Sequence, residues 1–299
     1  IERLGKEWLF FDGGMGSILQ ERGLAAGELP ETWNITRPEE IQSIHRAYLD
    51  AGSDIINTNT FGANALKFPD NLREIVESAV SNAKEARRQS GREDAYIALD
   101  LGPTGRLLQP MGDLPFEQAV ELFGEVVRIG AAAGVDLVLI ETMSDSYELK
   151  AAVLAAKENC DLPVLATVIF DEKGKMLTGG TVDSAVAMLE GLRVDALGVN
   201  CGLGPKQMLP IVKRLTEVSS LPVIVNPNAG LPRSENGKTV YDIDADEFAA
   251  LMGEIADLGV QVLGGCCGTT PAHIRKMIET CKSHYFVPVE KKHRTVVSS

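Results

Sequence analysis

Hydrophobic and polar positions follow one another along the chain in a repeating order. Short apolar runs lead into turns rich in Gly, Asn or Thr, and each turn leads into an amphipathic stretch. Several of the runs are almost continuously apolar, which is typical of strands buried on both faces of a parallel sheet. The pattern predicts eight strands, at residues 9–12, 54–60, 96–101, 136–142, 164–170, 196–201, 223–226 and 260–265.

The stretches between these runs carry signals for helix ends. Thr36 precedes Pro38, so we expect Thr36 to cap a helix that has Pro38 in its first turn and ends at Gly52. Two further prolines mark helix starts and two glycines mark helix ends, where a left-handed residue is favoured; these are Pro205, Pro271, Gly134 and Gly259.

Strands that alternate with helices in this way predict a closed (β/α)8 barrel of the TIM type, in the α/β class. An open doubly wound sheet is the alternative, but no G-x-G-x-x-G follows the first strand. We expect one domain over residues 1–285, in which residues 233–242, with Asn236 and Gly237, form an excursion. Residues 286–299 read as a polar linker to a further domain, and a chain that begins at Ile1 reads as part of a longer protein.

Charge and cysteine content narrow the classes of function. The chain has 29 Lys and Arg against 42 Asp and Glu, a formal charge of −13, which counts against binding to nucleic acid or to an anionic membrane. Its apolar runs are shorter than the ~18 to 20 residues of a spanning helix. Because the five cysteines are odd in number and no signal peptide is visible, we expect reduced thiols and a cytoplasmic protein, in which metal binding is possible.

The reactive groups of such a barrel lie at the carboxyl ends of its strands. Three cysteines lie at the ends of the sixth and eighth predicted strands: Cys201, Cys266 and Cys267. Three thiolates at one barrel mouth would bind zinc tetrahedrally and leave one position open, as in catalytic zinc sites. The alternative is that Cys201 is a small buried apolar residue and that the adjacent pair is incidental. The position of the three cysteines at strand ends does not by itself favour the zinc site over the packing role.

Two segments around these cysteines resemble the signature of the zinc-dependent homocysteine S-methyltransferases, namely Gly198-Val199-Asn200-Cys201 and Gly264-Gly265-Cys266-Cys267-Gly268-Thr269-Thr270-Pro271. Other motifs of that family are similar to residues 12–16, 58–61 and 141–142. Residues 102–105, 171–174, 226–230 and 236–241 resemble one branch most closely, the homocysteine-binding modules of cobalamin-dependent methionine synthases. The resemblance covers the chain from about Leu9 to Tyr285.

The resemblance implies a zinc ion held by the three cysteines, with the sulfur of L-homocysteine in the open position. Zinc coordination deprotonates a thiol, which prepares the substrate sulfur to attack a methyl group. By the same resemblance Glu141 holds the substrate ammonium, Asp12 assists it, and the turn with Gly13, Gly14 and Ser17 holds the substrate carboxylate. Asn59 also belongs to this set of substrate-binding residues. The plainer interpretations are a salt bridge at the rim for Glu141 and a turn cap for Asp12.

Asn228, beyond the seventh strand, is a candidate fourth zinc ligand when no substrate is present. An ordinary Asx-turn is the alternative. The four histidines lie away from the strand ends and are expected to be structural or solvated.

The methyl donor is the main ambiguity within the family. The polar tail resembles a link to a downstream folate-binding domain, which favours methylcobalamin carried on a separate corrinoid-binding domain or protein. S-methylmethionine ranks second. Betaine ranks third, because its quaternary ammonium would need an aromatic cage and aromatic residues make up only 5% of the chain.

A Schiff-base aldolase is disfavoured because no strand end carries a lysine. The non-catalytic alternative is a zinc-stabilised scaffold. Oligomeric state, and strictness for homocysteine over related thiols or selenols, are left open.

Overall fold

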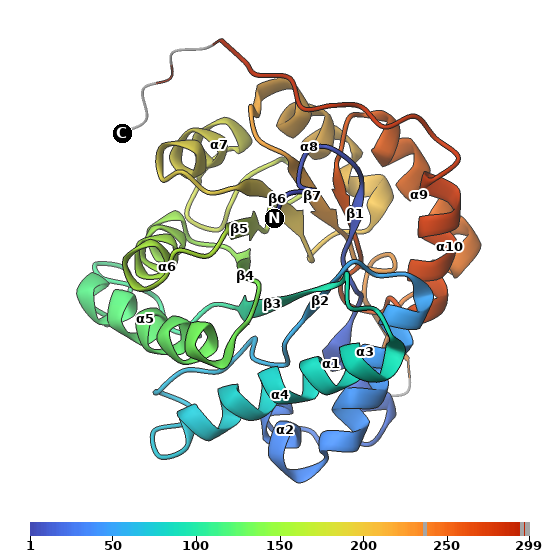
Figure 1. Ribbon diagram of the computed structural model, residues 1–299. Coiled ribbons are helices and arrows are strands. Elements are labelled where there is room, and N and C mark those ends of the chain that lie inside the picture. Colours follow the sequence, from blue (N-terminus) through green and yellow to red (C-terminus); the bar gives the residue numbers. More distant parts are fainter. Residues whose placement is uncertain (236–237, 294–295, 297–299) are drawn as a thin grey trace.

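The computed structural model describes residues 1–235, 238–293 and 296. Eight parallel strands lie in the order β1-β10-β7-β6-β5-β4-β3-β2, and a parallel bridge from Phe11 to Ile55 closes the sheet between β1 and β2 (Figure 1). This closure confirms the (β/α)8 barrel and excludes the open sheet. The strands are β1 (Leu9–Phe10), β2 (Ile55–Asn57), β3 (Tyr96–Leu101), β4 (Leu137–Met143), β5 (Val164–Val168), β6 (Ala196–Asn200), β7 (Val223–Asn226) and β10 (Val262–Leu263).

Helices surround the barrel on the outside (Figure 1). Long amphipathic helices cover the strands, with α1, a 3-10 turn and α2 inserted after β1. None of the helices in the described part of the chain is long and apolar enough to cross a bilayer. The helical elements are α1 (Met15–Glu21), η1 (Pro30–Thr32), α2 (Trp33–Thr36), α3 (Pro38–Ala51), α4 (Leu72–Ser90), α5 (Phe116–Ala133), α6 (Ser146–Asn159), α7 (Val182–Gly191), α8 (Pro205–Val218), α9 (Ala245–Asp257) and α10 (Pro271–Cys281).

The apolar core has two parts, as a barrel of strands buried on both faces requires. A small cluster fills the barrel interior and includes Leu9, Phe11, Ile55 and Leu139. The larger cluster lies between the strands and the helices. Side chains alternate between the two faces along each strand, so every second residue of a strand belongs to the interior.

The predicted helix ends are confirmed except for one cap. Pro38 occupies the first turn of α3, and Gly52 ends that helix in a left-handed conformation with φ of 108°. The expected cap at Thr36 is wrong, because Thr36 is the last residue of α2 and Arg37 precedes α3. The Thr36 hydroxyl donates to the carbonyl of Thr32 within that short helix, so it is not free to cap the next one.

A repeated device holds the amino-terminal end of the barrel together. The same arrangement precedes four strands of the barrel: β2, β4, β6 and β10. A residue with a left-handed backbone is followed, two positions later, by a residue whose side chain accepts a hydrogen bond from a backbone N–H of the barrel strand that precedes it in the sequence. The left-handed residues are Gly52, Gly134, Arg193 and Gly259. The bonds join Asp54 to Phe10 N, Asp136 to Ile97 N, Asp195 to Val164 N and Gln261 to Val223 N, at 3.1, 2.7, 2.7 and 3.0 Å.

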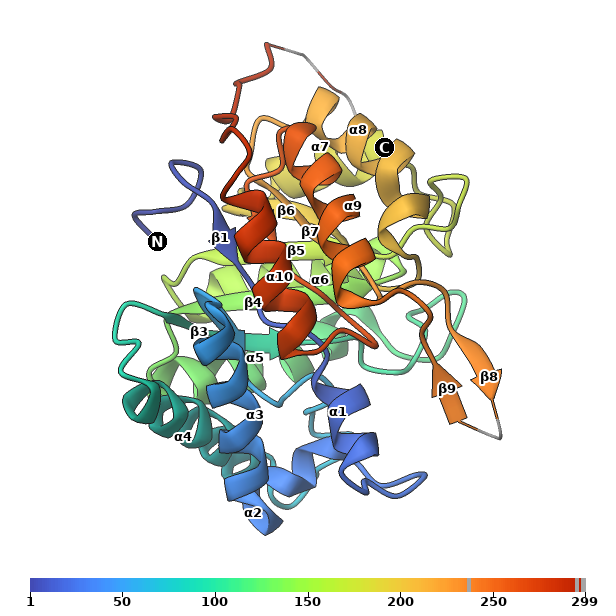
Figure 2. The ribbon, with the colours of Figure 1, turned by 90° about the vertical axis from the view of Figure 1, so that its right-hand side faces the viewer.

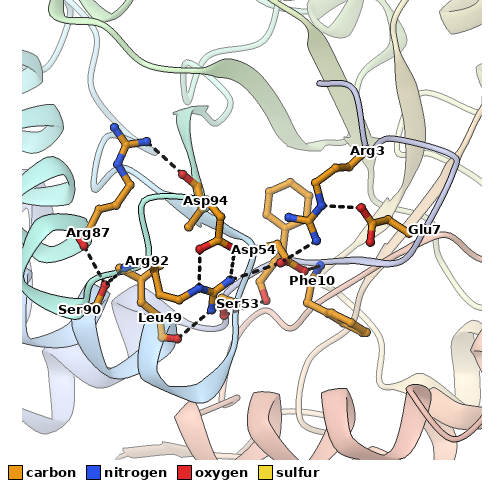
Figure 3. A network of polar contacts seen from close by, with 12 residues as sticks. Arg3, Glu7, Phe10, Leu49, Ser53, Asp54, Arg87, Ser90, Arg92 and Asp94 are labelled. Atoms are coloured by element: carbon orange, nitrogen blue, oxygen red, sulfur yellow. Dashed lines mark hydrogen bonds and ion pairs between the residues drawn. The ribbon is translucent and has the colours of Figure 1, made fainter.

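Basic side chains complete this end of the barrel. Figure 3 shows Asp54 between two arginines, Arg3 at 3.1 Å and Arg92 at 3.4 Å, which also bind Glu7 and Asp94. Arg87 pairs with Asp136, and Lys157 pairs with Asp195, in the same manner. The carboxylates therefore join neighbouring strands to one another and to the surrounding loops and helices.

Two segments depart from the barrel repeat. The predicted excursion is an antiparallel hairpin of β8 (Arg233–Glu235) and β9 (Lys238–Val240), which extends from the end of the barrel opposite to the amino terminus (Figure 2). Asn236 and Gly237, expected in its turn, lie outside the described residues. The segment after α10 contacts the barrel: Gln261 donates to the Val287 carbonyl at 2.9 Å, and Lys292 N donates to Ser220 Oγ at 2.8 Å. The assignment of residues 286–299 as a linker stays a prediction.

Candidate metal and substrate site

Polar side chains replace apolar ones inside the barrel as the strands approach their carboxyl ends. The alternation that places Ile55, Ala98, Leu139, Leu165 and Ile224 in the interior continues two residues further along each strand. At those positions the side chains are polar: Asn57, Asp100, Glu141, Thr167 and Asn226. On β6 the same alternation leads to Asn200. The mouth of the barrel is thus a polar layer placed on an apolar plug.

The three predicted cysteines meet at this mouth. The Sγ atoms of Cys201, Cys266 and Cys267 all lie within 4.8 Å of one another, with 3.9 Å between Cys201 and Cys267. Sulfurs bound tetrahedrally to one zinc at about 2.3 Å would stand about 3.8 Å apart. The cluster therefore has the donor type and the spacing for one tetrahedral zinc ion, with a fourth position left for another ligand.

Local backbone geometry brings the three thiols together. Cys201 has φ of 55°, an uncommon left-handed conformation for a residue with a side chain, and its N–H donates to the Asn226 carbonyl at 3.0 Å. Cys266 N donates to the Pro227 carbonyl at 2.8 Å. The loops after β6 and β10 are thus both held against the loop after β7.

The thiols have unequal acidities without a metal. Hydrogen bonds from Cys201 and Cys266, together with one from Tyr241, lower the pKa of Cys267 to about 3. Hydrogen bonding to its two neighbours and burial raise the pKa of Cys266 well above its usual range. One thiolate is therefore stabilised by two protonated thiols, and a cation that replaces their protons would bind all three sulfurs.

The loop after β1 is bound to the cysteine loop by hydroxyl groups. Tyr48 Oη donates to the carbonyls of Gly14 and Thr269, at 2.9 and 3.1 Å. Thr269 Oγ1 donates to the Cys266 carbonyl at 2.6 Å and accepts from Gly14 N at 3.1 Å. Ser17 Oγ accepts from Gly268 N at 3.3 Å. These bonds place the glycine turn beside the thiols, although they also occupy Gly14 N.

Three carboxyl groups share the mouth with the thiols: Asp12 and Asp100 are buried, and Glu141 is partly buried. Burial, followed by repulsion from Glu141, raises the pKa of both Asp12 and Asp100 well above the usual range. Burial and the nearby Cys267 raise the pKa of Glu141 to about 7. Within the described residues, every charged group that acts on these three pKa values is itself acidic. These three carboxyl groups, called the acidic pocket below, are therefore electrostatically suited to a cation.

Asn200 lies between the two groups. Its Nδ2 lies 3.3 Å from Glu141 Oε2, 2.7 Å from Thr142 Oγ1 and 4.0 Å from Cys266 Sγ. The side-chain amide of Asn200 therefore lies between the acidic pocket and the thiol cluster and contacts one member of each.

The remaining predicted residues have other contacts. Asn228 Oδ1 accepts from Cys267 N at 3.1 Å, so it is adjacent to the cluster, and that bond is not the one of an Asx-turn. Asn59 Nδ2 donates to the Pro30 carbonyl and to Asn34 Oδ1, which braces the β2 loop against η1 and α2. A metal-binding role for Asn228 and a substrate-binding role for Asn59 stay predictions.

Sequence reasoning missed three residues of this site, Asp100, Thr142 and Asn200, as participants in their own right. The signal for Asp100 and Asn200 was present, because both continue the inward alternation of their strands. Thr142 carried no such signal, since its φ of 63° belongs to an irregularity of β4 between Ile140 and Met143.

The fold and the site together define a class: a (β/α)8 barrel with three thiols and an acidic pocket at its carboxyl-terminal mouth. The sequence model of the homocysteine S-methyltransferase family matches residues 9–281, and the chain belongs to this family of methyltransferases. The methionine synthase of Mycobacterium tuberculosis is 34% identical over 296 residues, and that of Mycobacterium leprae is also 34% identical. Each match covers 93% of this chain but only 25% and 24% of the relative, so the chain spans about a quarter of their length.

Solved structures agree on the fold. The homocysteine methyltransferase MmuM from Escherichia coli superposes with a TM-score of 0.77 in its oxidized and metallated forms, at 23% identity. The alignment covers 91% of this chain and 95% of that one. Its apo form gives a TM-score of 0.73. At this identity the likeness establishes a shared barrel.

Proposed function

We propose that the chain is a zinc-dependent homocysteine-binding and methylating module. Cys201, Cys266 and Cys267 hold zinc, and homocysteine binds with its sulfur at the fourth position and its ammonium in the acidic pocket. The sulfur then receives a methyl group, and the product is methionine. Thiols in this state need a reducing compartment such as the cytoplasm.

One observation carries the proposal: the soft donors and the acidic pocket are neighbours, joined through Asn200. An amino acid with a side-chain thiol offers a soft sulfur and an ammonium group a few bonds apart. Its sulfur suits a thiolate-bound zinc, and its ammonium suits Glu141 and Asp12, which lack a basic partner among the described residues. The metallated form of MmuM supports metal binding by such a barrel.

The chain's own residues bind and orient the substrate. Zinc, when bound, lowers the pKa of a coordinated thiol so that the sulfur is available as a thiolate. Glu141 accepts hydrogen bonds from the substrate ammonium, and burial keeps that interaction strong. Free amides of the turn from Gly13 to Ser17 hold the carboxylate. Bound in this way, the sulfur faces the open end of the barrel, where a methyl donor can approach.

The favoured donor is methylcobalamin carried on a corrinoid-binding module, with a folate-binding domain as a further partner. Two observations support a donor of large size. The curated relatives are about four times as long as the matched region. Seven large apolar side chains are exposed in the segments that follow the carboxyl ends of the strands, six on loops and one in the first turn of α6, where a protein module could cover them; they are Phe61, Leu66, Leu107, Met111, Leu177 and Leu231 on loops, and Tyr147 in α6. S-methylmethionine and then betaine remain the alternative donors.

The binding proposal is tested by adding thiol ligands to the zinc-loaded protein and counting the sulfur atoms around zinc by X-ray absorption. The zinc should have three sulfur neighbours without substrate and four with homocysteine. Glu141→Gln should weaken homocysteine binding and leave the binding of propane-1-thiol, which has no ammonium, unchanged. A zinc-stabilised scaffold would instead keep a closed fourth ligand, with no added sulfur. Methionine formation with free methylcobalamin, S-methylmethionine or betaine would then identify the donor.

A further inference from the structure

We propose that Asn200 is a positioning residue that fixes the spacing between the thiol cluster and the acidic pocket, and so selects the chain length of the amino-acid thiol. The inference rests on the proposed function, because it assigns one end of the substrate to each group. It concerns how the barrel distinguishes homocysteine from its shorter homologue cysteine.

The hydrogen bonds of Asn200 use its whole amide group. The side chain is fully buried, and Oδ1 accepts from Thr142 N and from Thr167 Oγ1, both at 2.8 Å. Nδ2 is shared among Thr142 Oγ1, Glu141 Oε2 and Cys266 Sγ. An amide has two acceptor sites and two donor hydrogens, so each is engaged. Rotation of the side chain would break several bonds at once.

The same bonds hold a strained part of β4. Thr142 is β-branched and has φ of 63°, a conformation that such residues rarely adopt. Asn200 binds both the N–H and the hydroxyl of Thr142. Glu141 precedes Thr142 directly, so its direction depends on the backbone that Asn200 stabilises. Strain of this kind persists only where surrounding contacts determine it, and it occurs at functional sites.

A fixed spacing has a consequence for specificity. If the ligand sulfur is held by the metal and its ammonium by Glu141, a ligand makes both contacts only when its sulfur-to-nitrogen chain matches this spacing, and we expect a thiol with one methylene fewer to match it less well. Asn200 contacts both Glu141 and the metal-ligand Cys266, so it keeps the distance from adapting to the shorter ligand. Discrimination by one methylene is typically about 10- to 200-fold.

The test measures dissociation constants for homocysteine and cysteine in the cobalt-loaded protein, from changes in visible absorption. We expect Asn200→Ala and the isosteric Asn200→Asp to reduce the preference for homocysteine at least about tenfold, with propane-1-thiol affinity changed equally little in both. Gln261→Glu is the matched control, since Gln261 is a buried amide whose hydrogen bonds lie at the opposite, amino-terminal end of the barrel. An unchanged preference in both Asn200 variants would overturn the proposal.

A second readout needs no substrate. Loss of a group that orients a metal ligand typically weakens metal binding about 10- to 100-fold, so both variants should bind cobalt more weakly and shift its ligand-field bands. If parent protein fails to bind homocysteine, the proposed function fails, while unchanged cobalt bands in the variants would refute the role of Asn200 separately. If Asn200→Ala alone does not fold, the same substitution is made together with Thr142→Gly. Glycine adopts the left-handed backbone of position 142 without strain, so we expect the double variant to fold without the bonds from Asn200.

Discussion

The two ends of the barrel treat buried polar groups in opposite ways. At the amino-terminal end Asp54 accepts hydrogen bonds from a strand N–H and from two arginines (Figure 3), and the equivalent side chains at three other strand junctions each accept a strand N–H as well. At the carboxyl-terminal end several buried oxygens have no partner within the described residues: Asp12 Oδ1, Asn57 Oδ1, Asp100 Oδ1 and Asn226 Oδ1. Since unpaired buried polar groups destabilise a fold, their concentration at one end indicates a site built for a ligand.

Backbone strain follows the same division. At the amino-terminal junctions three of the four left-handed residues are glycines, which adopt that conformation at little cost. At the mouth the left-handed residues with side chains are Thr142 and Cys201. The barrel therefore gains stability at one end and tolerates strain and unpaired polarity at the other. Substitutions at the two ends should change different properties, and that separation can be tested.

The largest expected effect is loss of the metal from Cys266→Ala. Protein purified without oxygen should contain about one zinc per chain, and the variant almost none, because two thiols do not complete the site. Cys281→Ala is the control, since Cys281 is buried at the end of α10 and away from the cluster. Metal analysis checks the result. A well-folded, reduced parent that cannot be loaded with zinc would break the functional half of the comparison.

At the opposite end, Asp54→Ala should destabilise the fold by about 3 kcal/mol, because it removes a buried acceptor, leaves the strand N–H of Phe10 unpaired and takes one of two carboxylate partners from each of two arginines. Urea unfolding measures the loss. Zinc content and homocysteine affinity should remain those of the parent.

Asp94→Ala is the control for this substitution, because Asp94 binds the same Arg92 but its side chain is 60% exposed. It should change the free energy of unfolding by less than about 1 kcal/mol. Equal losses in the two variants would mean that burial of Asp54 contributes nothing.

The sequence predicted well the elements of the stable end and the clustering of the three cysteines at the mouth. Apolar runs located all eight strands, and glycines such as Gly52 and Gly134 marked helix ends, because burial and left-handed backbone impose strong local requirements. Cys201, Cys266 and Cys267 follow strand ends, so barrel geometry alone placed them at one mouth.

The interior polar layer was harder to predict. Strand alternation places Asp100 and Asn200 inside the barrel, but their partners lie on other strands, at sequence separations that no local pattern encodes. The conformation of Thr142 depends on Asn200, 58 residues away. Thr36 shows that a local pattern can also mislead. Its position before Pro38 predicts a helix cap, but Thr36 is instead the last residue of helix α2. Local signals thus define elements, whereas the chemistry depends on how those elements meet.

A third substitution should separate stability from binding within the mouth itself. Asp100 has a raised pKa, so the folded protein keeps its proton over a pH range in which the unfolded chain has lost it. Its contribution to stability therefore falls as pH rises above about 4, the ordinary pKa of aspartate. Asp100→Asn should stabilise the metal-free protein by about 1 kcal/mol at pH 8, with the gain disappearing near pH 4. Unfolding at both pH values checks this, and a loss of stability at pH 8 would contradict it.

The smallest expected effect tests whether the paired end acts as a network. Arg3 and Arg92 both bind Asp54, and their side chains are 28% and 25% exposed. Arg3→Ala alone should cost only about 0.5 kcal/mol, because Arg92 still pairs with the carboxylate and Arg3 itself is partly exposed to water. Removing both arginines should cost more than the sum of the single losses, since Asp54 is then buried without a cation. A double-mutant cycle in urea, repeated at high salt, measures this coupling. Additive losses would mean that each arginine acts alone, and that the amino-terminal end depends on the bond from Asp54 to Phe10 N more than on its charges.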